Sequence, residues 1–391
     1  TRWPHKCASY CLRSRSAKRK PVPGAGRKGC PTKASGCIPP LSDSDGPDMT
    51  IAATAKTSDR PQPRLPLCVD LDGTLLRGDM LIETVFALLR SKPWMVFEVL
   101  GWLIGGRAHL KARLATVAGH LVDVSALPYD EDLLSYIRGE RAAGRRVELI
   151  SASDQNLAQR VADHHGCFDA AVGSDGSRNL KGLMKADFLA DRYPGGFVYA
   201  GDSRADLKVW DLAGGAVLVG QGLAFEHELA TPIEARFGAA PDLRHLLPKA
   251  MRVHQWAKNG LIFLPLLLIN GLGNLTLVAE TVLGFVVFSL VASATYILND
   301  LLDLAADRSH PSKRNRPIAS GRLPMPIAVL VAGGLFGVGL VGATLLGGFF
   351  VMCLASYVAL TLIYSLGIKA VSVVDVITLG GLFTLRLLAG H

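Results

Sequence analysis

Residues 299–321 read NDLLDLAADRSHPSKRNRPIASG, and they follow directly on the apolar run VLGFVVFSLVASATYIL of residues 282–298. An apolar run of this length is close to the roughly 17–25 residues that a membrane-spanning helix needs. If the helix continues beyond this run, Asp300, Asp303 and Asp307 lie on one face, because residues three or four apart on a helix are neighbours. The stretch therefore predicts a membrane helix that carries three carboxylates where it leaves the bilayer.

Three clustered carboxylates repel one another unless a cation lies between them. Mg²⁺ takes carboxylate and phosphate oxygens as ligands, so the pattern predicts a Mg²⁺ ion held between the aspartates and a diphosphate. The prolines of this stretch end the helix and turn the chain back. Basic side chains then supply charge-assisted contacts to the diphosphate, and these are Arg308, Lys313, Arg314 and Arg316. The alternative is a solvated loop that only follows the positive-inside tendency.

Four further apolar runs, at residues 260–277, 327–346, 349–364 and 371–388, predict an all-α polytopic membrane bundle in the second half of the chain. The run at 260–277 is interrupted by Asn270 and glycines. The composition agrees, since 49% of the 391 residues are hydrophobic and the mean hydropathy is +0.29. Lys and Arg collect in alternate connections between the runs, which predicts that these connections are cytoplasmic.

The net charge of +9 belongs mainly to residues 1–48, where ten Lys and Arg oppose three Asp and leave +2 for the rest of the chain. The body is therefore not expected to bind nucleic acid. Residues 1–63 are rich in Ser, Pro and Gly, so we expect a disordered basic leader there. An organelle transit peptide has a similar composition. Because the chain begins with Thr1 and Met49 follows, mis-translated upstream sequence is a further alternative for this segment.

Four segments of the first half place polar side chains where predicted strands end or a helix begins. Predicted strands alternate with helical stretches, which indicates a parallel α/β sheet whose ligands bind at the carboxyl ends of the strands. The segments are PLCVDLDGTLL (66–76) with Asp70 and Asp72, RRVELISAS (145–153) with Ser151, NLKGLMKADFL (179–189) with Lys181 and Lys185, and GGFVYAGDSRADLKVW (195–210) with Asp202 and Asp206.

These four segments, in this order, resemble the motifs of the haloacid dehalogenase (HAD) superfamily over residues 64–245. The resemblance implies a Rossmann-like parallel sheet with a helical cap at about residues 80–140, and phosphohydrolase activity. It also implies roles for the side chains: Asp70 as nucleophile, Asp72 as general acid and base, Ser151 as a phosphoryl contact, Lys185 (with Lys181 in reserve) as the phosphate-neutralising lysine, and Asp70, Asp202 and Asp206 as the Mg²⁺ ligands.

The acidic stretch resembles the first aspartate-rich motif, N-D-x-x-D-x-x-x-D, of the UbiA superfamily of intramembrane prenyltransferases. The resemblance extends over residues 249–391 and includes RPIASG, MRVHQWAKN (251–259) and YSLGIK (364–369). It implies Mg²⁺ at Asp300, Asp303 and Asp307. The family also has a second acidic motif on a later loop, so we expect the domain to be incomplete at His391. The implied substrate and diphosphate contacts are Asn299, Arg308, Lys313, Arg314, Arg316, Lys258, Lys369 and Arg386.

The expected function is therefore a Mg²⁺-dependent membrane transferase that moves a prenyl group from a polyprenyl diphosphate to an acceptor, fused to a HAD-type phosphatase. A polyprenyl-phosphate phosphoribosyltransferase that uses phosphoribosyl diphosphate is the first alternative, because the same loop would bind its diphosphate. A membrane-tethered HAD phosphatase and a non-catalytic binder of anionic lipid headgroups are the others. The expected location is the bacterial inner membrane, with the HAD domain and the acidic loop on the cytoplasmic side.

Overall fold

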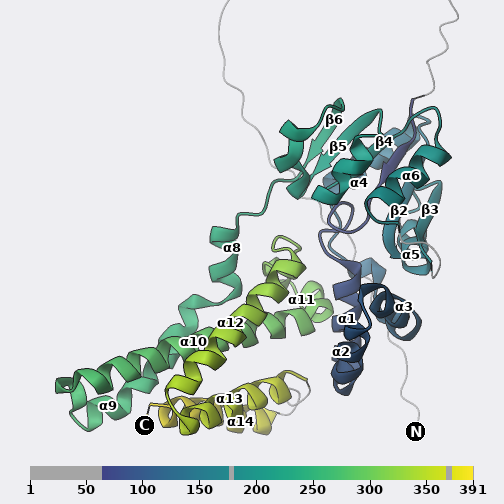
Figure 1. Ribbon diagram of the computed structural model, residues 1–391. Coiled ribbons are helices and arrows are strands. Elements are labelled where there is room, and N and C mark those ends of the chain that lie inside the picture. The colour runs from purple at the N-terminus through teal and green to yellow at the C-terminus, as the bar shows by residue number, and fades with distance from the viewer. Residues whose placement is uncertain (1–63, 176–179, 367–371, 391) are drawn as a thin grey trace, which may run out of the picture. The chain divides into compact units, whose positions relative to one another are not determined.

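A computed structural model describes residues 64–175, 180–366 and 372–390 of the chain (Figure 1). The expectations for residues 1–63, for Lys369 and for His391 fall outside these residues.

The first half forms one sheet of six parallel strands, as the sequence predicts. Its central strands are fully buried and continuously apolar, which is typical of a parallel sheet that is covered on both faces. The order across the sheet is β3-β2-β1-β4-β5-β6. The strands are β1 (Leu67–Val69), β2 (Val147–Asp154), β3 (Ala170–Ser174), β4 (Val198–Gly201), β5 (Gly215–Val219) and β6 (Ile233–Phe237).

Alternate residues of each central strand enter two different hydrophobic cores. Val69 of β1 packs in one core together with Ala200 of β4, whereas the adjacent Cys68 and Tyr199 pack in the other. This period of two follows from the opposite orientation of successive side chains in a strand. Helices cover both faces, and they are α4 (Glu131–Ala142), α5 (Gln155–His165), α6 (Leu183–Arg192) and the short α7 (Leu207–Trp210).

A helical insert lies between β1 and β2, in the region predicted to form a cap. It consists of α1 (Met80–Ser91), α2 (Val96–Ile104) and α3 (Arg107–Ala118), which share a small core of their own. Trp102 is buried in this core, but Trp94 and Phe97 are exposed. The helix α4, which the sequence places within the cap, packs against the sheet instead, because its Leu133, Leu134 and Ile137 belong to the core of the α/β sheet.

Among the described residues of the second half, three helices are long and apolar enough to cross a membrane: α10 (Leu275–Leu302), α12 (Met325–Leu345) and α13 (Gly348–Leu366). A fourth helix, α14 (Ser372–Leu388), covers the last predicted run, and its described apolar part is shorter. The predicted fold class, an α/β domain followed by an all-α membrane bundle, is confirmed.

The apolar run at residues 260–277 is not one continuous helix. It comprises the end of a 3-10 segment (Val253–Phe263), the short helix α9 (Leu264–Leu268) and a turn at Asn270, whose φ of +54° is left-handed. Asn274 then caps the start of α10 by accepting hydrogen bonds from two backbone N–H groups. The polar and glycine residues that interrupt the run therefore break the helix, and α10 begins a few residues later.

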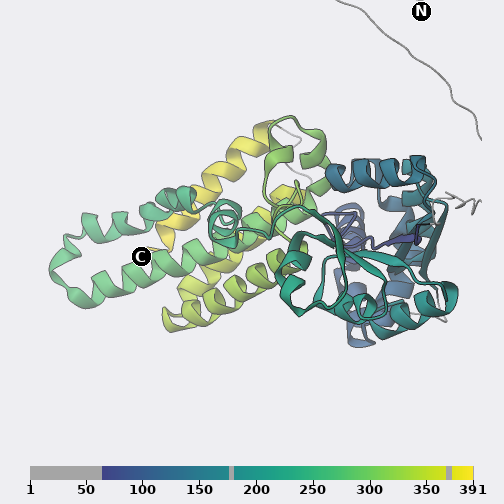
Figure 2. The same ribbon diagram turned by 90° about the horizontal axis from the view of Figure 1, so that it is seen from above.

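The helices α10 and α12 lie side by side in both views (Figures 1 and 2), and their backbones approach each other closely. Gly339 of α12 faces Val291 of α10 so closely that a methyl group on Gly339 would overlap with the valine side chain. Gly342 approaches Val287 in the same way. Small residues at such crossings let membrane helices approach closely and gain packing energy.

Candidate functional site

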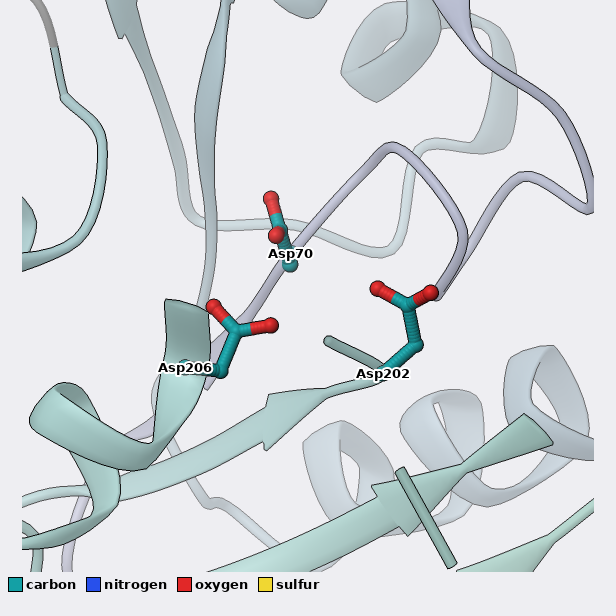
Figure 3. A group of neighbouring side chains, drawn as sticks. All are labelled: Asp70, Asp202 and Asp206. Atoms are coloured by element: carbon teal, nitrogen blue, oxygen red, sulfur yellow. The ribbon is translucent and has the colours of Figure 1, made fainter. Parts of the chain in front are cut away.

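Three carboxylates meet at the carboxyl ends of β1 and β4 (Figure 3). Asp70 follows β1 directly, and Asp202 follows β4, which is the neighbour of β1 in the sheet. Asp206 lies one turn further along the chain, and one oxygen of each of the three carboxylates lies within 4.8 Å of the others. Oxygen ligands at this spacing fit Mg²⁺, which completes its shell with water and substrate oxygens.

The pKa values of these groups show that the cluster favours a cation. Burial, followed by the charge of Asp70, raises the pKa of Asp202 to about 8. Burial also raises the pKa of Asp70, although Lys185 opposes this shift. A divalent cation would supply the missing positive charge and bring both carboxylates back to the ionised form. The donor set therefore fits the metal that the sequence predicts.

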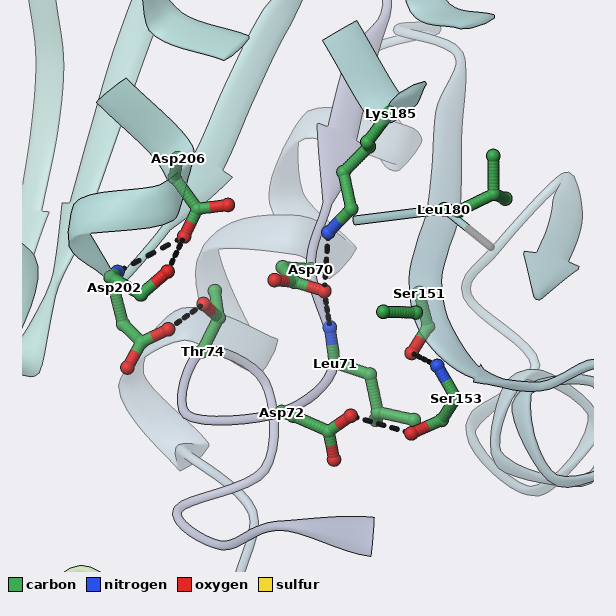
Figure 4. A network of polar contacts seen from close by, with 12 residues as sticks. Asp70, Leu71, Asp72, Thr74, Ser151, Ser153, Leu180, Lys185, Asp202 and Asp206 are labelled. Carbon is green, nitrogen blue, oxygen red and sulfur yellow. Dashed lines mark hydrogen bonds and ion pairs between the residues drawn. The ribbon is translucent and has the colours of Figure 1, made fainter. Parts of the chain in front are cut away.

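Lys185 approaches the cluster from the first turn of α6 (Figure 4). Its Nζ lies 2.9 Å from Oδ1 of Asp70 and donates to the hydroxyl of Tyr199 at 2.8 Å. Tyr199 in turn donates to Asp206 at 2.9 Å. Burial alone would lower the pKa of Lys185, but Asp70 and Asp206 outweigh it and raise the pKa, so the ammonium group stays charged. Lys181 also lines the cleft at this site but is exposed.

Asp72 has the environment of a group that gives and takes a proton. Its Oδ2 accepts from the hydroxyl of Ser153 at 2.6 Å, and its Oδ1 accepts from the backbone N–H of Met80 at 2.7 Å. Burial, and then the neighbouring Asp79, raise the pKa of Asp72 to about 7. A carboxyl group with this pKa can act as acid and as base near neutral pH.

Glycine is required at position 73 between these carboxylates. Gly73 has a φ of +80°, and a side chain there would overlap with the carboxylate of Asp202. Ser151, predicted to contact the phosphoryl group, is fully buried in β2, and its hydroxyl accepts from the backbone N–H of Ser153. It does not line the cleft in this structure, so its phosphoryl contact stays a prediction.

The cluster opens into a cleft of about 750 Å³. This volume is within the usual range for small-molecule sites. Besides the carboxylates and the two lysines, the walls include Leu246 and Lys249 of α8 (Leu243–Ala250). Residues around the start of α12 also line the cleft, among them Arg322 and Met325.

The acidic membrane loop has a different arrangement from the one predicted. The helix α10 ends at Leu302, and a second helix, α11 (Leu304–Ser309), begins after a break at Asp303. Arg316 bridges Asp300 (3.1 Å) and Asp307 (2.6 Å). Asp300 also lies 2.5 Å from Arg252. Arginines therefore neutralise these two carboxylates, which are on the same side of the loop, as the i to i+7 spacing predicts.

Asp303 faces a different partner, Arg90 of α1, at 3.6 Å. In the described part of the chain, Asp300, Asp303 and Asp307 do not come together as a single ion-sized group, unlike the trio at Asp70. Their Mg²⁺ ligation remains a prediction. Asn299, the first residue of the motif, accepts a hydrogen bond from the hydroxyl of Ser365 of α13.

The predicted basic contacts divide into exposed and buried groups. Lys258, Lys313 and Arg314 are exposed and accessible to a ligand. Arg308 is largely covered, with 9% of its side chain exposed, and its guanidinium donates to Glu83 of α1 at 2.5 and 3.1 Å. This ion pair makes Arg308 a contact between the loop and α1 in this structure.

Arg386 faces the interior of the helix bundle, as its position within an apolar run predicts. Its Nε donates to Asn259 at 2.8 Å, and its guanidinium lies 5.0 Å from the ring centre of Tyr357. An amide oxygen and aromatic rings therefore surround this buried guanidinium. Its contact with a diphosphate stays a prediction.

Several residues of these sites were not predicted from the sequence. Tyr199 looked like an ordinary strand residue, and Ser153 is noticeable only because it lies two residues after Ser151, on the same side of β2. Arg252 lies in the MRVHQWAKN segment, but nothing in that segment indicates that it pairs with Asp300. The ion pair of Glu83 with the loop joins residues more than 200 positions apart and has no local signal.

Comparisons with known proteins agree with this organisation. The model of the UbiA prenyltransferase family matches residues 261–391. The chain is 43% identical over 332 residues to "Uncharacterized protein y4nM" of Sinorhizobium fredii, which covers 84% of this chain and 64% of that protein. It is 38% identical over 146 residues to the decaprenyl-phosphate phosphoribosyltransferase of Mycobacterium tuberculosis, which covers 36% of this chain and 48% of that enzyme.

The chain thus spans between about half and two thirds of the length of these curated relatives. Among solved structures, a HAD family hydrolase from Salmonella enterica serovar Typhi is similar with 17% identity and a TM-score of 0.33, over 44% of this chain and 69% of that one. The UbiA prenyltransferase family model thus matches the helical second half of the chain, at residues 261–391, and this half follows an α/β domain with one six-stranded parallel sheet.

Proposed function

We propose that the membrane half transfers a phosphoribosyl group from phosphoribosyl diphosphate to a polyprenyl phosphate, and that the HAD-like half hydrolyses a phosphomonoester. The observation that carries the first part is the 38% identity over 146 residues to a protein named decaprenyl-phosphate phosphoribosyltransferase. Transfer of a prenyl group from a polyprenyl diphosphate is the second candidate, which the family of the matching model favours.

In the proposed transfer, a phosphate oxygen of the polyprenyl phosphate attacks C1 of the ribose as the bond from C1 to the diphosphate breaks. Asn299, Asp300, Asp303 and Asp307 would hold Mg²⁺, which stabilises the negative charge of the leaving diphosphate. The exposed Lys313 and Arg314 bind diphosphate oxygens. Arg316, which bridges two aspartates in the ligand-free loop, exchanges these partners for the diphosphate when substrate binds.

In the proposed hydrolysis, Asp70 attacks phosphorus and Asp72 donates a proton to the leaving alcohol. Asp72 then takes a proton from the water that releases phosphate from Asp70. The pKa of about 7 suits both steps. Lys185 offsets the repulsion between the Asp70 carboxylate and the anionic substrate. Mg²⁺ held by Asp70, Asp202 and Asp206 would polarise the phosphoryl oxygens.

The location follows from the same proposal. A polyprenyl substrate needs the bilayer, and the named relatives are bacterial, so we place the protein in the inner membrane of a bacterium. The basic loops and the HAD-like half share the cytoplasmic side, by the positive-inside tendency. We propose domain limits of 64–245 and 249–391.

Two assays of the full-length protein in nanodiscs test the two halves separately. With labelled phosphoribosyl diphosphate, polyprenyl phosphate and Mg²⁺, we expect a labelled lipid, and Asp300→Asn should lower its rate at least about 100-fold. Asp70→Asn, the matched control in the other half, should leave this transfer intact but abolish phosphate release from a phosphomonoester. Labelled lipid from prenyl diphosphate and an acceptor, but not from phosphoribosyl diphosphate, would establish the second candidate instead.

A further inference from the structure

The cleft of the HAD-like half reaches from the carboxylate cluster to the start of a membrane-length helix. One end is lined by Asp70, Asp202 and Lys185. The other end is lined by Met325 and Ile327, which are in the first turn of α12. Because α12 is long and apolar enough to span the bilayer, its first turn lies at the level where lipid headgroups meet water.

The wall between the two ends is continuous. Gly321, with a φ of +70°, packs so tightly on Arg77 that any side chain at Gly321 would overlap with the carbonyl of Arg77. A Cβ on Gly78 would lie 3.6 Å from the Cε of Met325. Arg77 and Gly78 follow shortly after Asp72, so the loop that carries the catalytic carboxylates contacts the beginning of the membrane helix directly.

The chemistry of the lining changes along the cleft. Carboxylates and Lys185 form the inner end, whereas the apolar Leu246 and Met325 line the membrane end. Two cations, Lys249 and Arg322, also line the membrane end. Both are exposed, and neither pairs with a carboxylate in the part of the chain that the structure describes. The guanidinium of Arg322 donates to the hydroxyl of Ser320 and to the carbonyl of Asn315.

From this arrangement we infer that the HAD-like site hydrolyses a lipid-linked sugar phosphate. Its terminal phosphomonoester binds at the Asp70 cluster, its second, diester phosphate binds at Lys249 and Arg322, and its hydrocarbon chain continues along α12. The inference rests on the hydrolase part of the proposed function.

The proposed transferase makes a compound of this chemical class. A phosphoribosyl group keeps its 5-phosphate when it is joined through C1 to a polyprenyl phosphate, so the product carries one phosphomonoester and one phosphodiester. Water cleaves the bond between phosphorus and the 5-oxygen. The sugar keeps that oxygen as a hydroxyl, inorganic phosphate leaves, and the diester to the lipid remains intact.

The test compares two phosphomonoesters with the same sugar, using the full-length protein in nanodiscs. The probes are synthetic farnesyl-phosphoryl-ribose 5-phosphate and free ribose 5-phosphate, and release of inorganic phosphate is measured. We expect kcat/KM to be at least about 100-fold higher for the lipid-linked probe. Supplying this probe directly makes the result independent of the transferase.

Variants that remove one positive charge from the cleft test where the diester phosphate binds. Arg322→Gln or Lys249→Gln should reduce the preference for the lipid-linked probe about tenfold each, since each removes one charge-assisted contact. The matched control is Arg244→Gln, on α8 but outside the cleft, which should keep the preference. Equal kcat/KM for the two probes, or a preference that survives both cleft variants, would overturn the inference and leave the hydrolase standing. Release from neither probe would overturn the hydrolase proposal as well.

Discussion

The ion pair between Glu83 and Arg308 offers a direct test of how α1 holds the acidic loop. Both side chains are buried, with 6% and 9% exposure, and two nitrogens of the guanidinium contact the two oxygens of the carboxylate at 2.5 and 3.1 Å. The Nε of Arg308 also donates to the carbonyl of Ala319 at 3.1 Å. Each of the three guanidinium nitrogens therefore has a partner, and Glu83→Gln removes the counter-charge on α1 while conserving shape.

The size of the effect follows from burial. The glutamine oxygen can still accept one hydrogen bond, so the variant loses about one charge-assisted bond, which is worth roughly 1.5–3 kcal/mol. Glu83→Leu removes both acceptors and leaves an unpaired buried cation, for which we expect about 3–5 kcal/mol. Replacing both partners by apolar residues, as in Glu83→Leu with Arg308→Met, should recover most of that loss, because no charge is left buried alone.

The coupling is measured by a double-mutant cycle of wild type, Glu83→Leu, Arg308→Met and the double variant. All four are unfolded thermally in the same detergent. We expect an interaction free energy of about 2–3 kcal/mol between positions 83 and 308. Strictly additive losses would show that the pair does not form and that α1 is not attached to the loop in this way. If Arg308→Met instead leaves stability unchanged but raises KM for the diphosphate substrate, Arg308 is the ligand contact that the sequence predicts.

Three other perturbations have defined outcomes. Burial alone would raise the pKa of Glu148, but its arginine and tyrosine partners outweigh burial and lower the pKa below the ordinary value of 4.5. The ionised Glu148 therefore stabilises the folded state above pH 4.5, and this contribution is lost as the pH falls through the lowered pKa of the folded state. Glu148→Gln should therefore lower the melting temperature at pH 7 but make little difference near pH 3, and an equal loss at both pH values would contradict this. Gly339→Ala should destabilise the α10–α12 crossing by about 1–3 kcal/mol. The control Gly337→Ala should not, because a methyl group at position 337 points into open space. Equal melting temperatures of the two variants would show that the helices do not approach closely. Lys185→Met should slow phosphate release about 100-fold or more. Lys181→Met should slow it much less, since Lys185 is the lysine that contacts Asp70, the proposed nucleophile. The reverse order would exchange their roles.

The parallel sheet and its carboxylate cluster were predictable because the relevant signals are local. A buried strand that ends in an aspartate places that aspartate at the sheet edge, and β1 and β4 are adjacent in the sheet. Asp70, Asp202 and Lys185 therefore meet where the sequence predicts. The contacts that tune them are not local in this sense, because Tyr199 is distinguished from its strand neighbours only by the hydroxyl that reaches Lys185.

The acidic loop shows the opposite situation. Periodicity correctly predicts that Asp300 and Asp307 lie on one side, but it assumes an unbroken helix, and the helix breaks at Asp303. After the break, Asp303 is directed to Arg90, a residue of the first half of the chain. Pairing over such a distance depends on tertiary packing, which helical spacing does not encode.

Helix α1 connects the two candidate sites physically. Its first backbone N–H binds Asp72, and its last turn carries Arg90, which lies 3.6 Å from Asp303. Twelve helical residues span about 18 Å, so a stiff element of fixed length separates Asp72 from the acidic loop. If the hydrolase removes the terminal phosphate of a lipid-linked product, that product loses the group that Lys185 and the metal site bind. Its affinity for the cleft then falls while its lipid chain stays in the bilayer. Hydrolysis thereby releases the product into the membrane and removes it from the reverse transfer, and this gives a physical reason for carrying both chemistries on one chain.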